Sequence, residues 1–190
     1  MMLITGLISF AQTDLGFLNA GVEYNYYPAG HLIGLQTEIA VKRDSHKDAF
    51  QNPHHSVNFR LGVNLTDRKD FSKFNDHESG WGYGASVGYR YYLSRNWRAG
   101  YAGLYFGARS DVWLMNINWE DASQMPSSGK SSITVVQPTF EIGYKLPIMQ
   151  YDIILGIANG VELNVRTVGD EVGHGWITEA QLVIARRLYH

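Results

Sequence analysis

Charged residues at alternate positions along the chain are the first candidates for chemistry. They are Glu23, Glu38, Asp111, Glu141, Glu162 and Glu179, with the cations Arg60, Arg90, Arg109, Lys145, Arg166 and Arg187. If these groups converge in a space closed to bulk water, they form paired ions, a path for protons or ions, or a catalytic cluster with shifted pKa values. We favour a structural network of pairs, because an unpaired buried charge is strongly destabilising.

Histidine and serine residues are the second candidates. His46, His54, His55, His77 and His174 fall in polar stretches of the sequence. A metal site needs several converging ligands, and these histidines have neither a partner four residues on nor a third ligand in register. We therefore predict no metal site and no cofactor.

An alternation of period 2 positions these residues. From Ile153 to Thr167, apolar side chains alternate with glycine, polar or charged ones, which predicts a β-strand. The pattern recurs and predicts strands over residues 15–27, 31–42, 56–66, 80–93, 97–116, 133–146, 152–167 and 176–189. The expected fold is all-β, an eight-stranded antiparallel up-and-down transmembrane β-barrel.

Glycine indicates which face of each strand points inward. The glycines that share the parity of the charged residues are Gly21, Gly34, Gly62, Gly82, Gly84, Gly88, Gly103, Gly107, Gly143, Gly156 and Gly160. The interior of a narrow barrel must fit side chains from every wall, so small residues belong there. The charged face therefore points into the lumen, and the opposite face forms an apolar belt that only lipid makes acceptable.

Composition agrees with a barrel in a membrane. The chain is 45% hydrophobic and 13% aromatic, with 12 Tyr and 5 Trp, and aromatic residues near strand ends are typical of interfacial girdles. A net charge of −2 gives no basic field for nucleic acid. The absence of cysteine excludes disulfides and thiol catalysis.

The first residues differ from the rest. The segment 1–10 is apolar, and Ala11-Gln12 resembles the end of a secretory signal, although a basic start is missing. We expect residues 1–12 to be a signal-peptide remnant and residues 13–190 to form the barrel.

Two strands carry a resemblance to known proteins. Residues 84–97, GASVGYRYYLSRNW, and residues 140–146, FEIGYKL, resemble the small outer-membrane β-barrel proteins abundant in Bacteroidota, which are similar to the OmpA/OmpX-type transmembrane domain. The resemblance covers nearly all of residues 13–190. It implies a location in the outer membrane of a Gram-negative bacterium, in contact with outer-membrane lipid and lipopolysaccharide. The family's assembly signal ends in an aromatic residue, whereas here Tyr189 is followed by His190.

Two other functions stay open, a lipid A-modifying hydrolase and a small solute channel. His55-Ser56 and His77-Glu78-Ser79 supply the Ser, His and acid that outer-membrane lipid A deacylases use. Adjacency in sequence is a weak signal of a catalytic triad, so we favour a non-enzymatic protein. A channel needs an open lumen, whereas the interiors of eight-stranded barrels are normally filled.

Long polar stretches are predicted as outer loops over residues 67–79, 117–132 and 168–175, with short turns at the periplasmic end. The first strand pair does not fit this arrangement. The polar stretch 43–55 is expected at the periplasmic end yet is long, and residues 28–30 are expected to form an outer loop yet are short. Aromatic and polar residues at these loops are candidate partner contacts: Phe71, Phe74, Trp113, Met115, Trp119, Ser123, Met125, Ser127, Ser128, Gly129 and Lys130. For Trp113 a place in the girdle is slightly favoured. The predicted function is a structural or surface-interaction barrel that binds a surface protein or a glycan through its loops.

Overall fold

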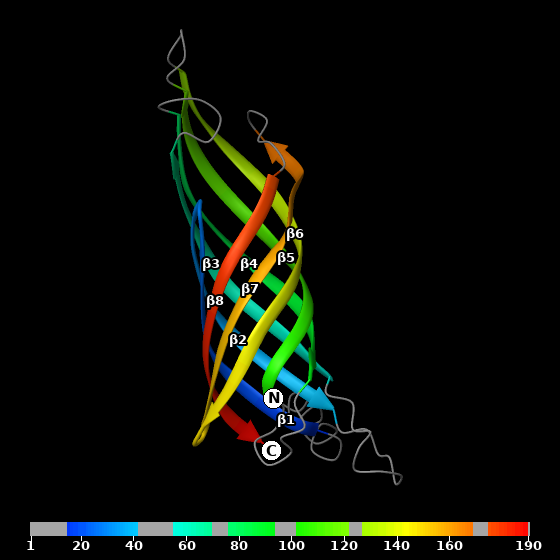
Figure 1. Ribbon diagram of the computed structural model, residues 1–190. Helices are drawn as coiled ribbons and strands as arrows, with labels where there is room; N and C mark the ends of the chain where they lie inside the picture. The colour runs from blue at the N-terminus through cyan, green and yellow to red at the C-terminus, as the bar shows by residue number, and fades with distance from the viewer. Residues whose placement is uncertain are drawn as a thin grey trace, which may run out of the picture.

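The chain folds into a closed antiparallel β-barrel (Figure 1). The computed structural model describes residues 15–41, 55–69, 76–93, 102–121, 127–168 and 175–189. Over these residues the strands are β1 (Leu15–Tyr27), β2 (Gly30–Val41), β3 (His55–Lys69), β4 (His77–Tyr92), β5 (Gly103–Asp121), β6 (Ser127–Ile148), β7 (Tyr151–Val168) and β8 (Gly175–Tyr189). Each strand pairs with its neighbours in sequence, and β1 pairs with β8. The predicted fold class is confirmed.

The strand bounds differ most from prediction at β5 and β6. β5 begins at Gly103 rather than at residue 97, and β6 begins at Ser127 rather than at residue 133. The predicted loop 117–132 is wrong over most of its length, because β5 and β6 pair up to Asp121 and Ser127. The predicted loop 67–79 is also too long, since β3 runs to Lys69 and β4 begins at His77.

The two ends of the barrel differ. β1 begins and β8 ends at one end, which we call the proximal end. At the other, distal end the β1–β2 hairpin turns at Pro28-Ala29, whereas β5 and β6, of 19 and 22 residues, continue past it (Figure 1). The segments 42–54 and 94–101, for which a long and a short connection are predicted, lie outside the described residues.

The barrel interior contains a network of charged side chains and two apolar clusters. The distal cluster is Leu32, Trp113, Met115, Ile117, Ile133 and Val135. The proximal cluster is Tyr92, Tyr105, Ile154, Val183 and Ala185. The prediction that Trp113 lies in the girdle is wrong, because its side chain is fully buried inside the barrel.

Glycines make room for the aromatic rings in these clusters. A Cβ atom on Gly84 would lie 2.4 Å from the Trp113 ring, and one on Gly143 would lie 2.5 Å from the Tyr105 ring. A bulky ring on one strand therefore requires a glycine on the neighbouring strand. This explains why these two glycines occupy inward-facing positions.

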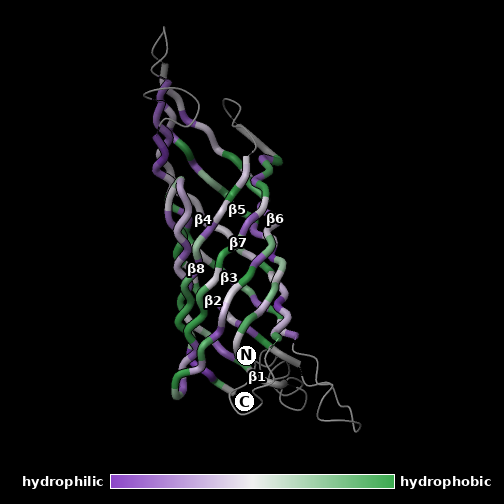
Figure 2. The backbone as a smooth tube through the Cα atoms, in the orientation of Figure 1, coloured by the Kyte–Doolittle hydropathy of each residue, from purple (hydrophilic) through white to green (hydrophobic). Residues whose placement is uncertain are grey.

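The outer surface is apolar around the body of the barrel. Leu35, Phe140 and Trp176 are 69%, 78% and 79% exposed, and hydrophobic residues follow the strands through the lower and middle barrel in Figure 2. Beyond this belt the outer face of β5 becomes polar and the inner face apolar. Ile117 faces inward there, while Asn116 and Asn118 face outward. The tall distal strands are accordingly hydrophilic (Figure 2). The described residues include no helix that could cross a membrane.

Candidate functional site

Charged side chains from seven of the strands meet in the middle of the barrel. Strand alternation turns every second side chain inward, so distant parts of the sequence share one interior. The predicted residues that the structure buries there are Glu23, Glu38, Arg60, Arg90, Arg109, Asp111, Glu141, Lys145 and Glu179.

Arg109 on β5 is the centre of the network. Its guanidinium lies 2.5 Å from Glu179, 2.8 Å from Glu141, 3.0 Å from Asp111 and 3.4 Å from Glu23. The five donors of an arginine fork suit several carboxylates at once. Arg109 therefore joins β1, β5, β6 and β8 across the barrel.

Arg60 on β3 shares two of these carboxylates. It lies 2.5 Å from Glu23 and 2.7 Å from Asp111. Its guanidinium carbon is 5.3 Å from the centre of the Trp113 ring, a distance that favours a cation–π contact. The distal apolar cluster and the charge network thus share a direct contact.

Arg90 on β4 connects this centre to the proximal part of the network. It donates to Glu141 at 3.1 Å and to Gln181 at 3.3 Å, and it lies 4.8 Å from the centre of the Tyr105 ring. With its amide oriented to suit its neighbours, Gln36 accepts from Arg90 and donates to Glu23. The two parts of the network are therefore continuous.

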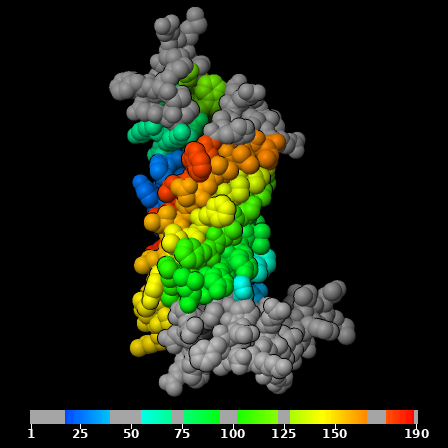
Figure 3. All heavy atoms as spheres, turned by 45° about the vertical axis from the view of Figure 1, so that its right-hand side comes forward, coloured from blue at the N-terminus to red at the C-terminus, as the bar shows by residue number. Residues whose placement is uncertain are grey.

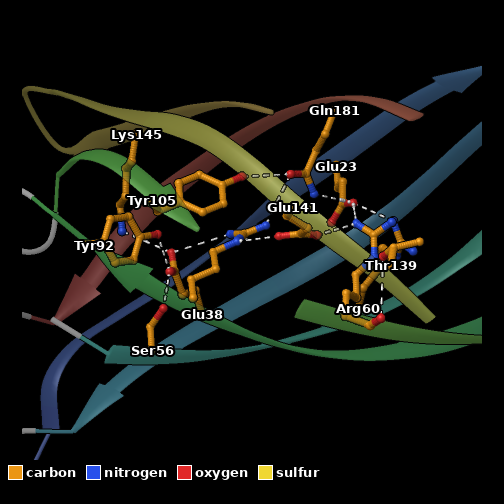
Figure 4. A network of polar contacts seen from close by, with 12 residues as sticks. Glu23, Glu38, Ser56, Arg60, Tyr92, Tyr105, Thr139, Glu141, Lys145 and Gln181 are labelled. Carbon is orange, nitrogen blue, oxygen red and sulfur yellow. Dashed lines mark hydrogen bonds and ion pairs between the residues drawn. The ribbon is translucent and has the colours of Figure 1, made fainter. Parts of the chain in front are cut away.

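Glu38 on β2 collects the proximal donors, as Figure 4 shows. Its carboxylate accepts from Ser56 and Tyr92, each at 2.5 Å, and from Lys145 at 3.1 Å. The Asn19 amide adds a bond at 3.3 Å. The Glu38 carboxylate therefore accepts hydrogen bonds from four side chains on four different strands.

Asp152 on β7 is a member that the sequence interpretation missed. It is fully buried and lies 3.3 Å from both Lys145 and Arg187. Asp152 lies on the same face of β7 as Gly156 and Gly160, so the alternation of the sequence could have predicted that it points inward. It was missed because it lies at the predicted start of its strand.

Two predicted members stand apart from the centre. Glu162 is half-buried and accepts a bond from Gln137 at 2.9 Å. Among the described residues, Arg187 contacts the network through Asp152. The side chain of Arg166 lies outside the described residues.

The histidine and serine candidates do not converge. His55 faces outward and bonds to the Tyr89 hydroxyl, whereas Ser56 points into the barrel and donates to Glu38. The hydrolase pairing of His55 with Ser56 is therefore wrong, since the barrel wall separates them. At the distal rim His77 donates to Asp67 at 2.8 Å, while its neighbour Glu78 faces inward.

Other candidates are placed only in part. No group of His, Asp and Glu in the described ranges could hold a metal ion. Met115 is buried in the distal cluster, and Trp119 is half-buried against Gly129. Candidates that lie outside the described residues are His46, His54, Phe71, Phe74, Ser123, Met125 and His174.

The arrangement is suited to holding the walls together. At least one carboxylate contacts each network cation whose side chain is described, namely Arg60, Arg90, Arg109, Lys145 and Arg187. Aromatic rings lie over Arg60, Arg90 and Lys145. Such a network specifies strand register, because each charge has its partners in one arrangement only. A nucleophile with a free general base is not among the buried residues described here.

Comparisons with known proteins find similar solved structures. No family model matches the chain, and no curated protein matches it in sequence. Among solved structures, a major outer membrane protein of Thermus thermophilus is 16% identical, with a TM-score of 0.48, covering 90% of this chain and 99% of that one. The attachment invasion locus protein Ail of Yersinia pestis, solved with the heparin analogue sucrose octasulfate, is 7% identical, with a TM-score of 0.42 and coverages of 90% and 97%. Neisserial surface protein A is 9% identical, with a TM-score of 0.39 and coverages of 92% and 97%. At these identities the likeness concerns the fold alone.

Proposed function

We propose that this protein is a non-enzymatic barrel of a Gram-negative outer membrane, with a lumen closed by paired charges and a distal wall that contacts surface partners. The observation that carries the proposal is the outward face of the strands. Large apolar side chains such as Leu61, 68% exposed, surround the body of the barrel. In water such a belt would drive aggregation, whereas in a bilayer it contacts acyl chains.

Aromatic clusters mark the two edges of this belt. At the distal edge His31 lies against Tyr24 and Tyr26, and at the proximal edge His55 lies against Tyr89 and Tyr91. Amphipathic rings of this kind concentrate where headgroups meet hydrocarbon. We infer that these two clusters lie at the two interfaces of the membrane.

The distal wall formed by the ends of β3, β4, β5 and β6 is the proposed interaction surface. Its outward residues are polar, among them Asn118, Lys130 and Ser132, and it rises past the β1–β2 hairpin (Figure 1). Rigid strands can hold such a surface away from the bilayer. A surface protein or a glycan is the proposed class of partner.

Folding in detergent tests the membrane location. The protein should remain soluble only in detergent or lipid, and it should run faster on SDS gels before boiling than after. Purification as a stable detergent-free monomer would contradict the proposal.

Thiol labelling tests the orientation, because the chain contains no native cysteine. On intact cells an impermeant maleimide should label Ser128→Cys on the distal wall but not Met149→Cys at the proximal end, where Met149 is 92% exposed. Permeabilised cells should show both labels. The reverse pattern would place the wall in the periplasm.

Planar bilayers test the closed lumen against the channel. The wild-type barrel should show no steady conductance, because both apolar clusters and the charge network fill its interior. Stable unitary currents would favour the channel.

A further inference from the structure

A groove of about 690 Å³ crosses the outer wall of the barrel within the apolar belt. It is lined by residues of β3 to β8, and Figure 3 shows this side of the barrel, with β5 and β6 in green to yellow. Its floor consists of small residues, Ala108, Ser110 and Gly160, and its sides include Phe140 and Trp176. Its volume is in the range of pockets that hold small ligands.

Proline on β6 explains why the wall is hollowed here. Pro138 lines the groove and has no N–H for the strand ladder. The pairing of β6 with β7 joins Val136 to Leu163 and resumes at Thr139 with Gly160. A Cβ on Gly160 would lie 2.1 Å from the Pro138 carbonyl oxygen, so the backbones approach closely at this point.

The groove offers no charge to a ligand. Arg109 contributes to its lining, but the Arg109 guanidinium is buried inside the barrel and bonded to carboxylates. The other lining residues are apolar, small or neutral. An acyl chain is the occupant that fits an uncharged groove inside the apolar belt.

A polar pair lies at the Trp176 end of the groove. Asn159 is exposed on the outer wall and donates to the Thr178 hydroxyl at 2.7 Å. The Asn159 side-chain oxygen can still accept a hydrogen bond. The Thr178 hydroxyl accepts from Asn159 and still has a proton to donate. Polar groups facing hydrocarbon are costly, so this pair favours a lipid whose acyl chain brings a hydroxyl group to it.

The depth of the pair indicates which part of the lipid it meets. Thr178 lies two residues from Trp176 along β8, about 7 Å further into the belt. Trp176 faces outward near the distal end of β8, where an interfacial tryptophan meets headgroups. The polar pair is thus at the depth of the first carbons of an acyl chain.

We propose that the groove binds one lipopolysaccharide molecule of the outer leaflet, with a hydroxylated acyl chain along Ala108 and Ser110 and the hydroxyl group of that chain at Asn159 and Thr178. This proposal rests on the proposed membrane location and orientation. It assigns a specific lipid site to a face that would otherwise contact lipid without preference.

Native mass spectrometry of the folded barrel with lipid A or with a non-hydroxylated phosphatidylethanolamine tests the site. Wild type should retain one lipid A molecule and little phosphatidylethanolamine. Ala108→Phe, which fills the groove floor, should weaken lipid A retention about tenfold or more. The matched control is Ala85→Phe, an outward alanine on β4 that does not line the groove, and it should retain lipid A as wild type does.

Asn159→Leu isolates the polar contribution. It should lower retention of lipid A towards that of phosphatidylethanolamine. Equal retention of both lipids by wild type, or lipid A retention unchanged in Ala108→Phe, would overturn the proposal. A dimer that Ala108→Phe abolishes would assign the groove to a second copy instead.

Heat-dependent SDS mobility, measured on every variant, separates this proposal from the proposed function. Folded, heat-modifiable barrels without selective lipid A retention would overturn the groove site alone. Failure of wild type to require detergent would overturn the membrane location itself.

Discussion

Arg109 and Glu179 lie 2.5 Å apart across the barrel interior, and both side chains are almost fully buried. This pair is one of four that Arg109 makes. Replacing Arg109 by Met should take from Glu179 its arginine partner, and should remove one of two arginine partners from Glu23, Asp111 and Glu141. We expect this change to lower the free energy of unfolding by about 3 to 5 kcal/mol.

The control for this prediction is Arg186→Met, because Arg186 is exposed on the outer side of β8. Its effect should stay within about 0.5 kcal/mol. Urea unfolding in lipid vesicles measures both variants. Losses of similar size would show that the buried network does not stabilise the barrel.

Trp113 should contribute far more to stability than Trp81. Trp113 is fully buried in the distal cluster, whereas Trp81 is 54% exposed on the outer surface. Trp113→Ala removes a ring from a packed interior and should cost about 3 to 5 kcal/mol. Trp81→Ala should cost clearly less in the same unfolding assay. The opposite order would mean that the inward and outward assignments of β4 and β5 are reversed.

Ser56 should affect stability and not catalysis. Its hydroxyl donates to Glu38 inside the barrel, so Ser56→Ala should lower stability by about 1 to 2 kcal/mol. Neither wild type nor the variant should hydrolyse lipid A in micelles. Ser79→Ala, at the distal rim, serves as the comparison. Turnover that is lost in either variant would favour the hydrolase.

The distal rim should show a pH-dependent pair. Beyond the apolar belt, the hydrogen bond from His77 lowers the pKa of the Asp67 carboxyl below its usual value of 3.8. An acid whose pKa is depressed on folding stabilises the fold above its unfolded pKa, and this contribution is lost as pH falls through the folded pKa. The contribution should therefore be full at neutral pH, start to decline near pH 3.8, and be lost once the pH has fallen through the lowered pKa of the folded state.

Carboxyl NMR chemical shifts measure this pKa directly. In His77→Ala the pKa of Asp67 should rise towards 3.8. An unchanged titration of Asp67 would show that the His77 contact does not form in solution.

Period-2 alternation predicted the strands wherever one face meets hydrocarbon. Residues such as Glu23 and Arg60 could be assigned to the interior because their neighbours Val22 and Leu61 are apolar and lie on the outside. The exact partners could not be predicted, because register across non-neighbouring strands depends on the tilt of the closed barrel. The contact between Arg109 and Glu179 is one example.

Prediction failed where the surroundings of the strands change. On β5, Trp113 shares the parity of Arg109 and Asp111, yet an aromatic residue near a predicted strand end suggested the girdle. Beyond the belt, Ile117 faces inward and Asn118 outward, as in a sheet exposed to water. Because the outer face of β5 is polar here, an apolar outer face predicts an end of the strand that is too early.

The pairing of β1 with β8 has a consequence for how the protein assembles. It joins Asn19 on the first strand of the barrel to Arg187 on the last, so β1 has only β2 as a neighbour until β8 is in place. An unpaired strand edge in hydrocarbon leaves N–H and C=O groups without partners, each costing several kcal/mol. Partly inserted chains should therefore be unstable, and insertion should proceed as a single cooperative event that is complete only when the seam closes.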